Sequence, residues 1–345
     1  MMVDRILSRR EVMGLLLTMS GCASSAPNAS GSRTAAVVAT TGMVGDLVQF
    51  LTPPDLGRVA VLIRPGVDPH LYRATRADLL KVFDARLVFY SGLHLEGRMD
   101  ALFERANRPG RPSLPVTSQI PHEELIFPDD GFDRPDPHVW MDVGLWRSTV
   151  PVMVGGLSQA FPQFQTHFAE RAQVLEPLLD RLNSAVGEAM ASIPEKQRLL
   201  ITSHDAFAYF SRMYKIPVES IQGVTTDSEP GVADIDRIVS LICDRQLPAI
   251  FTESSVNDRG LRAVTEGVRA RGHRVELVGP LYTDALGEPG TAAGTYLGMM
   301  VANARLIAST LGGSTTPLDA LETDMMPEKN HVTTARSVTT RTAGV

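Results

Sequence analysis

Short apolar segments alternate with helix-like segments along most of this chain, and this alternation is interrupted near the middle. Segments such as "AAVVAT", "RVAVLI" and "RLVFYS" have the length and composition of buried strands, and each is followed by a helix-like segment. The pattern resumes later with "RLLITS", "AIFTES" and "RVELVG". Such alternation predicts an α/β fold with mostly parallel sheets covered by helices.

The interruption covers residues 164–191, where apolar residues recur at helical spacing with no strand among them. A helix of this length measures about 40 Å and can bridge two lobes. We therefore predict an N-terminal β/α lobe over residues 35–163, a connecting helix over 164–191 and a C-terminal β/α lobe over 192–312. Pro177 lies inside the helical segment and predicts a kink or a break there.

The first residues predict an export signal followed by an anchor. Three arginines precede the apolar run "VMGLLLTM", which is too short to span a bilayer, so residues 1–21 are interpreted as a signal peptide. Cys22 follows small residues and is similar in position to the cysteine of a bacterial lipoprotein box. Residues 22–34 would then be a lipid-anchored flexible tether. A plain signal with an incidental cysteine stays open, as do the Sec and twin-arginine export routes.

The end of the chain and the overall charge limit the other expectations. Residues 313–345 are polar and show no periodicity, which predicts a disordered tail. The formal net charge of -6 leaves no large basic surface, so we expect no nucleic-acid partner.

Four residues capable of binding a metal ion follow predicted strands or lie in a long loop. His70, His204 and Asp284 come shortly after strands, and His138 lies in the loop "DRPDPHVWMD". Open α/β sheets bind ligands at the carboxyl ends of their strands. Two of the four residues fall in each predicted lobe, so a cleft between the lobes could bring them together.

Three imidazoles and one carboxylate suit a divalent first-row metal such as zinc or manganese. The histidines of such a site usually donate their second ring N–H to a carboxylate or a carbonyl, and Asp142, Asp205 and Glu253 are candidates for that role. The residues alone leave an alternative open, in which His204 is a core histidine that bonds to a neighbouring carbonyl.

Six segments resemble one known family. They are "GVDPHLYRAT", "SGLHLEGRMD", "PHVWMDV", "SHDAFAYFSRMYKIPVESIQGVTTDSEP", "LPAIFTESS" and "LYTDALGEPGTAAGTYLGMM". In this order they are similar to the TroA-like solute-binding lipoproteins of bacterial manganese and zinc ABC importers, over nearly all of residues 35–312. The resemblance implies two α/β lobes joined by a rigid helix, with one metal ion in the cleft between them. It places the ligands on His70, His138, His204 and Asp284.

The resemblance also implies a function. The protein would be a monomeric binding protein and no enzyme, held by lipid on Cys22 at the outer face of the cytoplasmic membrane, in the periplasm or at the cell surface. It would capture zinc or manganese as cargo and deliver it to an ABC permease that a cytoplasmic ATPase drives. Manganese-selective members tend to carry glutamate at the third ligand position, where this chain has His204. Zinc-specific members often have a long, histidine-rich acidic loop before the second ligand. In this chain the loop is acidic but holds only His122, so zinc, manganese and iron stay open as the cargo.

Two other functions compete with import. A zinc-dependent enzyme is one, but catalytic zinc keeps an open coordination position, whereas four protein ligands close the shell. A surface adhesin or a siderophore-type binding protein on the same two-lobe fold is the other. A siderophore would need a roomy cleft instead of four converging small ligands.

Overall fold

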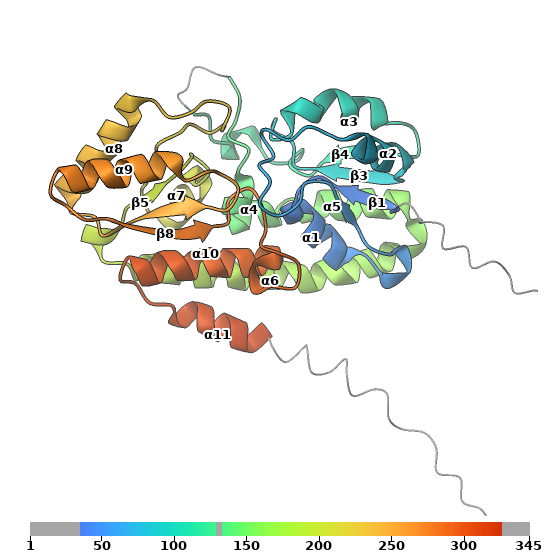
Figure 1. Ribbon diagram of the computed structural model, residues 1–345. Coiled ribbons are helices and arrows are strands. Elements are labelled where there is room, and N and C mark those ends of the chain that lie inside the picture. Colours follow the sequence, from blue (N-terminus) through green and yellow to red (C-terminus); the bar gives the residue numbers. More distant parts are fainter. Residues whose placement is uncertain (1–34, 129–132, 326–345) are drawn as a thin grey trace, which may run out of the picture. The chain divides into compact units, whose positions relative to one another are not determined.

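The computed structural model describes residues 35–128 and 133–325 (Figure 1). The predicted signal peptide (1–21), Cys22 with its tether (22–34) and the last part of the predicted tail (326–345) lie outside these ranges. Among the helices of the described ranges, none combines the length and the apolar character that a membrane crossing requires.

The N-terminal lobe contains one parallel sheet of four strands in the order β2-β1-β3-β4. Alternate residues of β1 and β3 face opposite sides of this sheet: Val38 and Val88 join one core, while Val37 and Leu87 join another. Helices α2 and α3 cover the first face, and α1 and α5 cover the second (Figure 1). The elements are β1 (Val37–Ala39), α1 (Gly42–Leu51), β2 (Ala60–Val61), α2 (Arg76–Asp84), β3 (Leu87–Tyr90), α3 (Asp100–Ala106), β4 (Ser113–Pro115), α4 (Val143–Arg147) and α5 (Val150–Ala160).

Two details of this lobe bear on the sequence analysis. The Thr75–Asp78 capping box at the start of α2 is present, with each side chain bonded to the other residue's backbone N–H. Strand β4 was not predicted; it follows Pro112 and ends at Pro115, and proline is unfavourable in a strand interior. The strand is tolerated because it lies at the edge of the sheet, where a missing N–H costs little.

The C-terminal lobe pairs its strands as β5-β6 and β7-β8, again in parallel. Its elements are β5 (Leu200–Thr202), α7 (Ala208–Tyr214), β6 (Val218–Ser220), α8 (Val232–Arg245), β7 (Ala249–Glu253), α9 (Arg259–Ala270) and β8 (Glu276–Leu281). The predicted α/β class with parallel sheets is therefore confirmed.

A single helix, α6 (Gln165–Ala191), occupies the predicted connecting segment and is unbroken over 27 residues. Of the two outcomes predicted for Pro177, a kink or a break, the break does not occur. Proline removes one backbone hydrogen bond, but helices of both lobes pack along α6 and stabilise it on either side of that position. The largest hydrophobic core runs through both lobes along this helix. The lobe boundaries near 163 and 192 therefore stay predictions.

The predicted disordered tail begins too early. After α10 (Tyr296–Thr310), the chain forms another helix, α11 (Thr316–Met325), which packs on α6. Leu318 and Leu321 of α11 are buried, and Arg305 of α10 forms ion pairs with the acidic face of α11. Two leucines one turn apart supply a narrow apolar face, which is too little to register as a periodic pattern in a ten-residue segment.

Candidate metal centre

The structure brings the four predicted residues together. His70 lies in the loop between β2 and α2, His138 lies just before a short 3₁₀ helix (Val139–Met141), His204 follows β5 and Asp284 follows β8. Each offers one ligand atom, and these atoms all lie within 4.8 Å of one another. All four residues are buried. Loops at the carboxyl ends of parallel strands thus converge on one point, as the strand positions predicted.

The spacing of these atoms suits a metal ion. His70 Nε2 and His138 Nε2 lie 3.1 Å apart, and the two carboxylate oxygens of Asp284 lie 3.3 Å from His138 Nε2 and from His204 Nε2. Nitrogen atoms bound to zinc in a tetrahedral site at about 2.1 Å are about 3.4 Å apart. Among the described residues, His204 Nε2 and Asp284 Oδ1 have no hydrogen-bond partner. Unpartnered buried atoms are costly, and a bound cation would satisfy both.

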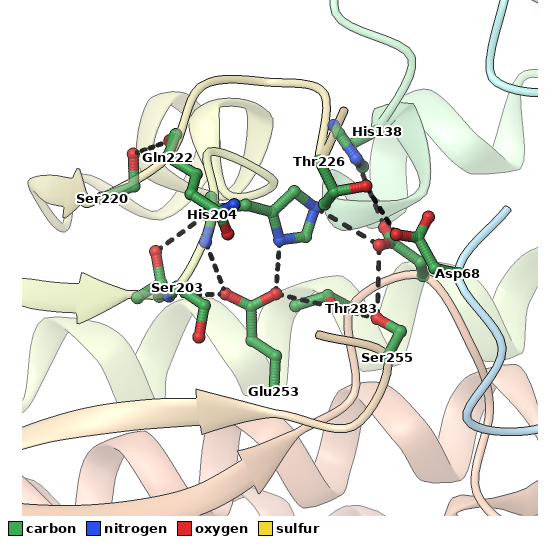
Figure 2. A network of polar contacts seen from close by, with 12 residues as sticks. Asp68, His138, Ser203, His204, Ser220, Gln222, Thr226, Glu253, Ser255 and Thr283 are labelled. Carbon is green, nitrogen blue, oxygen red and sulfur yellow. Dashed lines mark hydrogen bonds and ion pairs between the residues drawn. The ribbon is translucent and has the colours of Figure 1, made fainter. Parts of the chain in front are cut away.

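Glu253 fixes the ring of His204 from behind. Its carboxylate lies 2.5 Å from His204 Nδ1 and also accepts the backbone N–H groups of Ser203 and His204, at 2.7 and 2.9 Å (Figure 2). Thr283 donates its hydroxyl to the same carboxylate. A proton held on Nδ1 leaves the lone pair of Nε2 directed at the cluster, which is the tautomer that a metal ion requires.

Asp136 does the same for His138 and was missed in the sequence analysis. One of its oxygens lies 2.7 Å from His138 Nδ1 and accepts the backbone N–H of His138 at 2.8 Å. The sequence carried a signal, because "DPH" occurs at residues 68–70 and again at 136–138. In the first copy, Asp68 accepts the backbone N–H of His70 at 2.8 Å.

The other two candidate carboxylates do not contact the histidine rings. Asp142 caps α4 by accepting the N–H of Leu145 at 3.0 Å, because the first N–H groups of a helix lack intrahelical partners. Asp205 is a neighbour of His204 in sequence, but its side chain makes no hydrogen bond to a histidine in the part of the chain that the structure describes. Of the three candidates, only Glu253 holds a ring.

The electrostatics of the cluster favour a cation. Burial opposes a charge on His138, but the carboxylates of Asp136 and Asp284 outweigh burial and raise its pKa to about 9. The pKa of His204 is likewise raised well above its usual value against burial, by Glu253 and Asp284. Burial opposes the charge of Asp284 too, yet His204 and His138 hold its pKa well below the usual range. For His70 burial dominates and lowers the pKa to about 3. Buried carboxylates thus favour positive charge at this site, and a metal ion that binds there would displace the protons from the histidine nitrogens.

The fold and this cluster define a class: an α/β protein with a long helix and one buried three-histidine, one-aspartate site that could hold a metal ion. Residues 37–310 match the family model described as the zinc-uptake complex component A, periplasmic, and the chain belongs to this family.

Individual relatives agree with this assignment. The chain is 38% identical over 300 residues to the manganese-binding lipoprotein MntA of Bacillus subtilis, covering 87% of this chain and 97% of the relative. It is 39% identical over 290 residues to the zinc-binding protein TroA of Treponema pallidum, covering 82% of this chain and 93% of the relative.

Solved structures share the fold. The periplasmic zinc-binding protein TroA of Treponema pallidum superposes with a TM-score of 0.75 at 39% identity, over 80% of this chain and 98% of that chain. The Fe(III)-bound YtgA of Chlamydia trachomatis superposes with a TM-score of 0.71 at 26% identity, over 81% and 98% of the two chains. The fold and the family expected from the sequence are confirmed.

Proposed function

We propose that this protein binds one divalent transition metal ion through His70, His138, His204 and Asp284 and delivers it to an ABC permease for uptake. The observation that carries the proposal is the convergence of three imidazole nitrogens and one carboxylate, all buried; among the described residues, His204 Nε2 and Asp284 Oδ1 have no hydrogen-bond partner. Membership of the zinc-uptake family supports the same role.

The geometry favours binding over catalysis. Four protein ligands fill a tetrahedral shell, whereas a catalytic zinc needs a position for water and a general base beside it. The carboxylates next to the cluster, Asp136 and Glu253, already accept hydrogen bonds at the histidine rings. A binding protein needs such a closed site, and the enzyme alternative is not favoured. The adhesin and siderophore alternatives lack support from the relatives compared above.

The ligand set suits zinc and tolerates manganese. Imidazole favours zinc and its neighbours, while the Asp284 carboxylate can bind through two oxygens and so accept a larger coordination number. The names of the relatives mention manganese, zinc and Fe(III). We propose zinc or manganese as the cargo and expect the isolated site to bind zinc more tightly, following the Irving–Williams order.

The variant His204→Ala tests the ligand set. Loss of one of four ligands should weaken zinc binding by orders of magnitude, because water must then complete the shell. His204→Glu should retain binding and shift the relative preference toward manganese, since a second carboxylate makes the set harder. Competitive titration of both ions against wild type measures the effects, with exposed His122→Ala as the matched control. If His204→Ala binds zinc as tightly as wild type, the four-ligand site is wrong.

Export and anchoring complete the proposal. Lipid on Cys22 would tether a monomer to the outer face of the cytoplasmic membrane, where the permease and its ATPase take over the metal. Cys22→Ser should abolish partitioning into detergent and leave zinc affinity intact, because the tether is separate from the folded lobes. Cys243→Ser is the matched control, since Cys243 is a free cysteine of the C-terminal lobe. If Cys22→Ser and wild type partition equally into detergent, the proposed lipid anchor on Cys22 is wrong.

A further inference from the structure

The ring of His70 is held differently from the other two histidine rings. His138 and His204 each have a carboxylate at Nδ1, at 2.7 and 2.5 Å. Within residues 35–128 and 133–325, no carboxylate bonds to the second nitrogen of His70. His70 is also 7% exposed, against 0% for the other two, and lines a cavity of about 580 Å³. His70 is therefore the least restrained ligand and the one nearest the opening.

The restraint on His70 comes through Asp68 instead. One carboxylate oxygen of Asp68 accepts the backbone N–H of His70 at 2.8 Å. The other oxygen accepts the hydroxyl of Thr226, which belongs to the opposite lobe, at 2.5 Å (Figure 2). The position of His70 thus depends on a hydrogen bond that crosses between the lobes.

Thr226 lies in residues 222–230, between β6 and α8, which we name the latch segment. The start of this segment is bonded to the loop of His204: Gln222 donates its N–H to the carbonyl of Ser203 at 3.0 Å, and Asp205 donates its N–H to the carbonyl of Gly223 at 3.2 Å. One short segment therefore contacts the backbone around His204 and, through Thr226, the backbone around His70.

A second contact crosses the lobes beside the first. Asp227 of the latch segment pairs with Arg98 at 2.6 Å, and Arg98 also donates to the carbonyl of Leu71, next to His70, at 3.4 Å. This ion pair is more exposed than the Thr226 contact, so solvent screens it and its contribution is smaller.

We propose that the latch segment sets the rate at which metal enters and leaves the site, with Thr226 and Asp68 as positioning residues and His70 as the ligand that detaches first. This inference rests on the proposed function. The latch contacts join protein to protein and touch no metal ligand atom of the cluster. Loss of these contacts should therefore lower the free-energy barrier to metal entry and to metal release alike. The equilibrium affinity should change much less than the two rates.

The test measures zinc release from zinc-loaded protein mixed rapidly with an excess of a chromogenic chelator. Thr226→Val keeps the shape of the side chain and removes the hydroxyl, so release should be about tenfold faster, in line with a hydrogen bond to a charged group. Equilibrium zinc affinity should change by less than about threefold. Thr226→Ser restores the donor and should release zinc at the wild-type rate. Thr225 is an exposed neighbour of Thr226, so Thr225→Val is the matched control and should also release zinc at the wild-type rate.

A second variant covers a failure of Thr226→Val to fold, which thermal melting would reveal. Asp68→Ala removes both carboxylate oxygens, so the N–H of His70 and the hydroxyl of Thr226 both lose their acceptor, and release should again be faster. The latch is overturned if wild type binds zinc and both folded variants release it at the wild-type rate. No zinc bound by wild type overturns the proposed function itself, which separates the two failures.

Discussion

Each lobe contains a buried glutamate that holds the loop after a strand, but only one of the two touches the metal cluster. In the N-terminal lobe, Glu96 accepts the backbone N–H groups of Ser91 and Gly92 at 2.8 and 3.2 Å and the hydroxyl of Thr40 at 2.5 Å. In the C-terminal lobe, Glu253 likewise accepts two successive backbone N–H groups and a threonine hydroxyl. The two lobes thus place the same kinds of donor around a buried carboxylate.

The difference lies in what the held loop carries. The loop after β5 carries His204, whose ring also bonds to Glu253, so one carboxylate fixes both the backbone and the ligand. The loop after β3 carries His94, which bonds to Asp100 at the surface and belongs to no candidate metal cluster among the described residues. The N-terminal lobe places His70 in another loop, where it relies on Asp68. The comparison teaches that a shared structural device supports the metal in one lobe only.

Among the variants that test this comparison, the largest effect is expected for Glu253→Gln, on zinc affinity. The amide nitrogen cannot accept the Nδ1 proton of His204, so the ring would adopt the other tautomer and its Nε2 would carry hydrogen. Zinc affinity should fall by about 10–100-fold. Competitive zinc titration measures it, with Glu96→Gln as the matched control. Similar affinities for Glu253→Gln and wild type would show that the ring needs no carboxylate.

The next effect is on stability and concerns Glu96→Gln. The amide nitrogen would face the N–H of Gly92, so a buried donor loses its acceptor at a cost of about 1–3 kcal/mol. Urea unfolding of the metal-free protein measures the loss. Zinc affinity of this variant should match wild type, and a large loss of affinity would instead make Glu96 part of the metal site.

The smallest effect is the pH dependence of that stability difference. Burial raises the pKa of the Glu96 carboxyl, although its hydrogen bonds with Thr40, Ser91 and Gly92 act in the opposite direction. The folded protein therefore holds this proton more tightly than the unfolded chain. The stability from Glu96 is fully present at low pH and is lost as pH rises through the raised pKa. Glutamine does not titrate, so the deficit of Glu96→Gln should be larger near pH 5 than near pH 8. Urea unfolding curves at both pH values measure the deficit. A larger deficit near pH 8 than near pH 5 would contradict the raised pKa of Glu96.

Local patterns predicted the fold and suggested the cluster, and the family resemblance placed its four residues. Strand length and apolar composition located the strands, and the ends of those strands located His70, His204 and Asp284. Glu253 was one of three candidate carboxylates for a histidine ring, and its place at the end of β7 brings it to His204. Asp136 was missed although "DPH" occurs twice in the sequence, because the repeat alone does not tell which carboxylate bonds to the ring of His138.

The contacts between the lobes could not be predicted for a different reason. Thr226 and Asp68 are separated by 158 positions, and nothing in either segment marks the other as its partner. Helix α11 was missed because its burial depends on the surface of α6 instead of its own apolar content. Tertiary packing decided both cases.

The indole of Trp140 has an optical consequence. It donates its N–H to the carbonyl of Thr283, the residue before Asp284, at 2.8 Å, and its ring meets that of His138 edge to face at 5.2 Å between centroids. The only other tryptophan of the chain, Trp146, lies 6.3 Å from Trp140. All indole fluorescence of the protein therefore originates beside the cluster. An ion that enters the cluster would change the surroundings of these indoles, so the emission of the protein reports whether the site is filled.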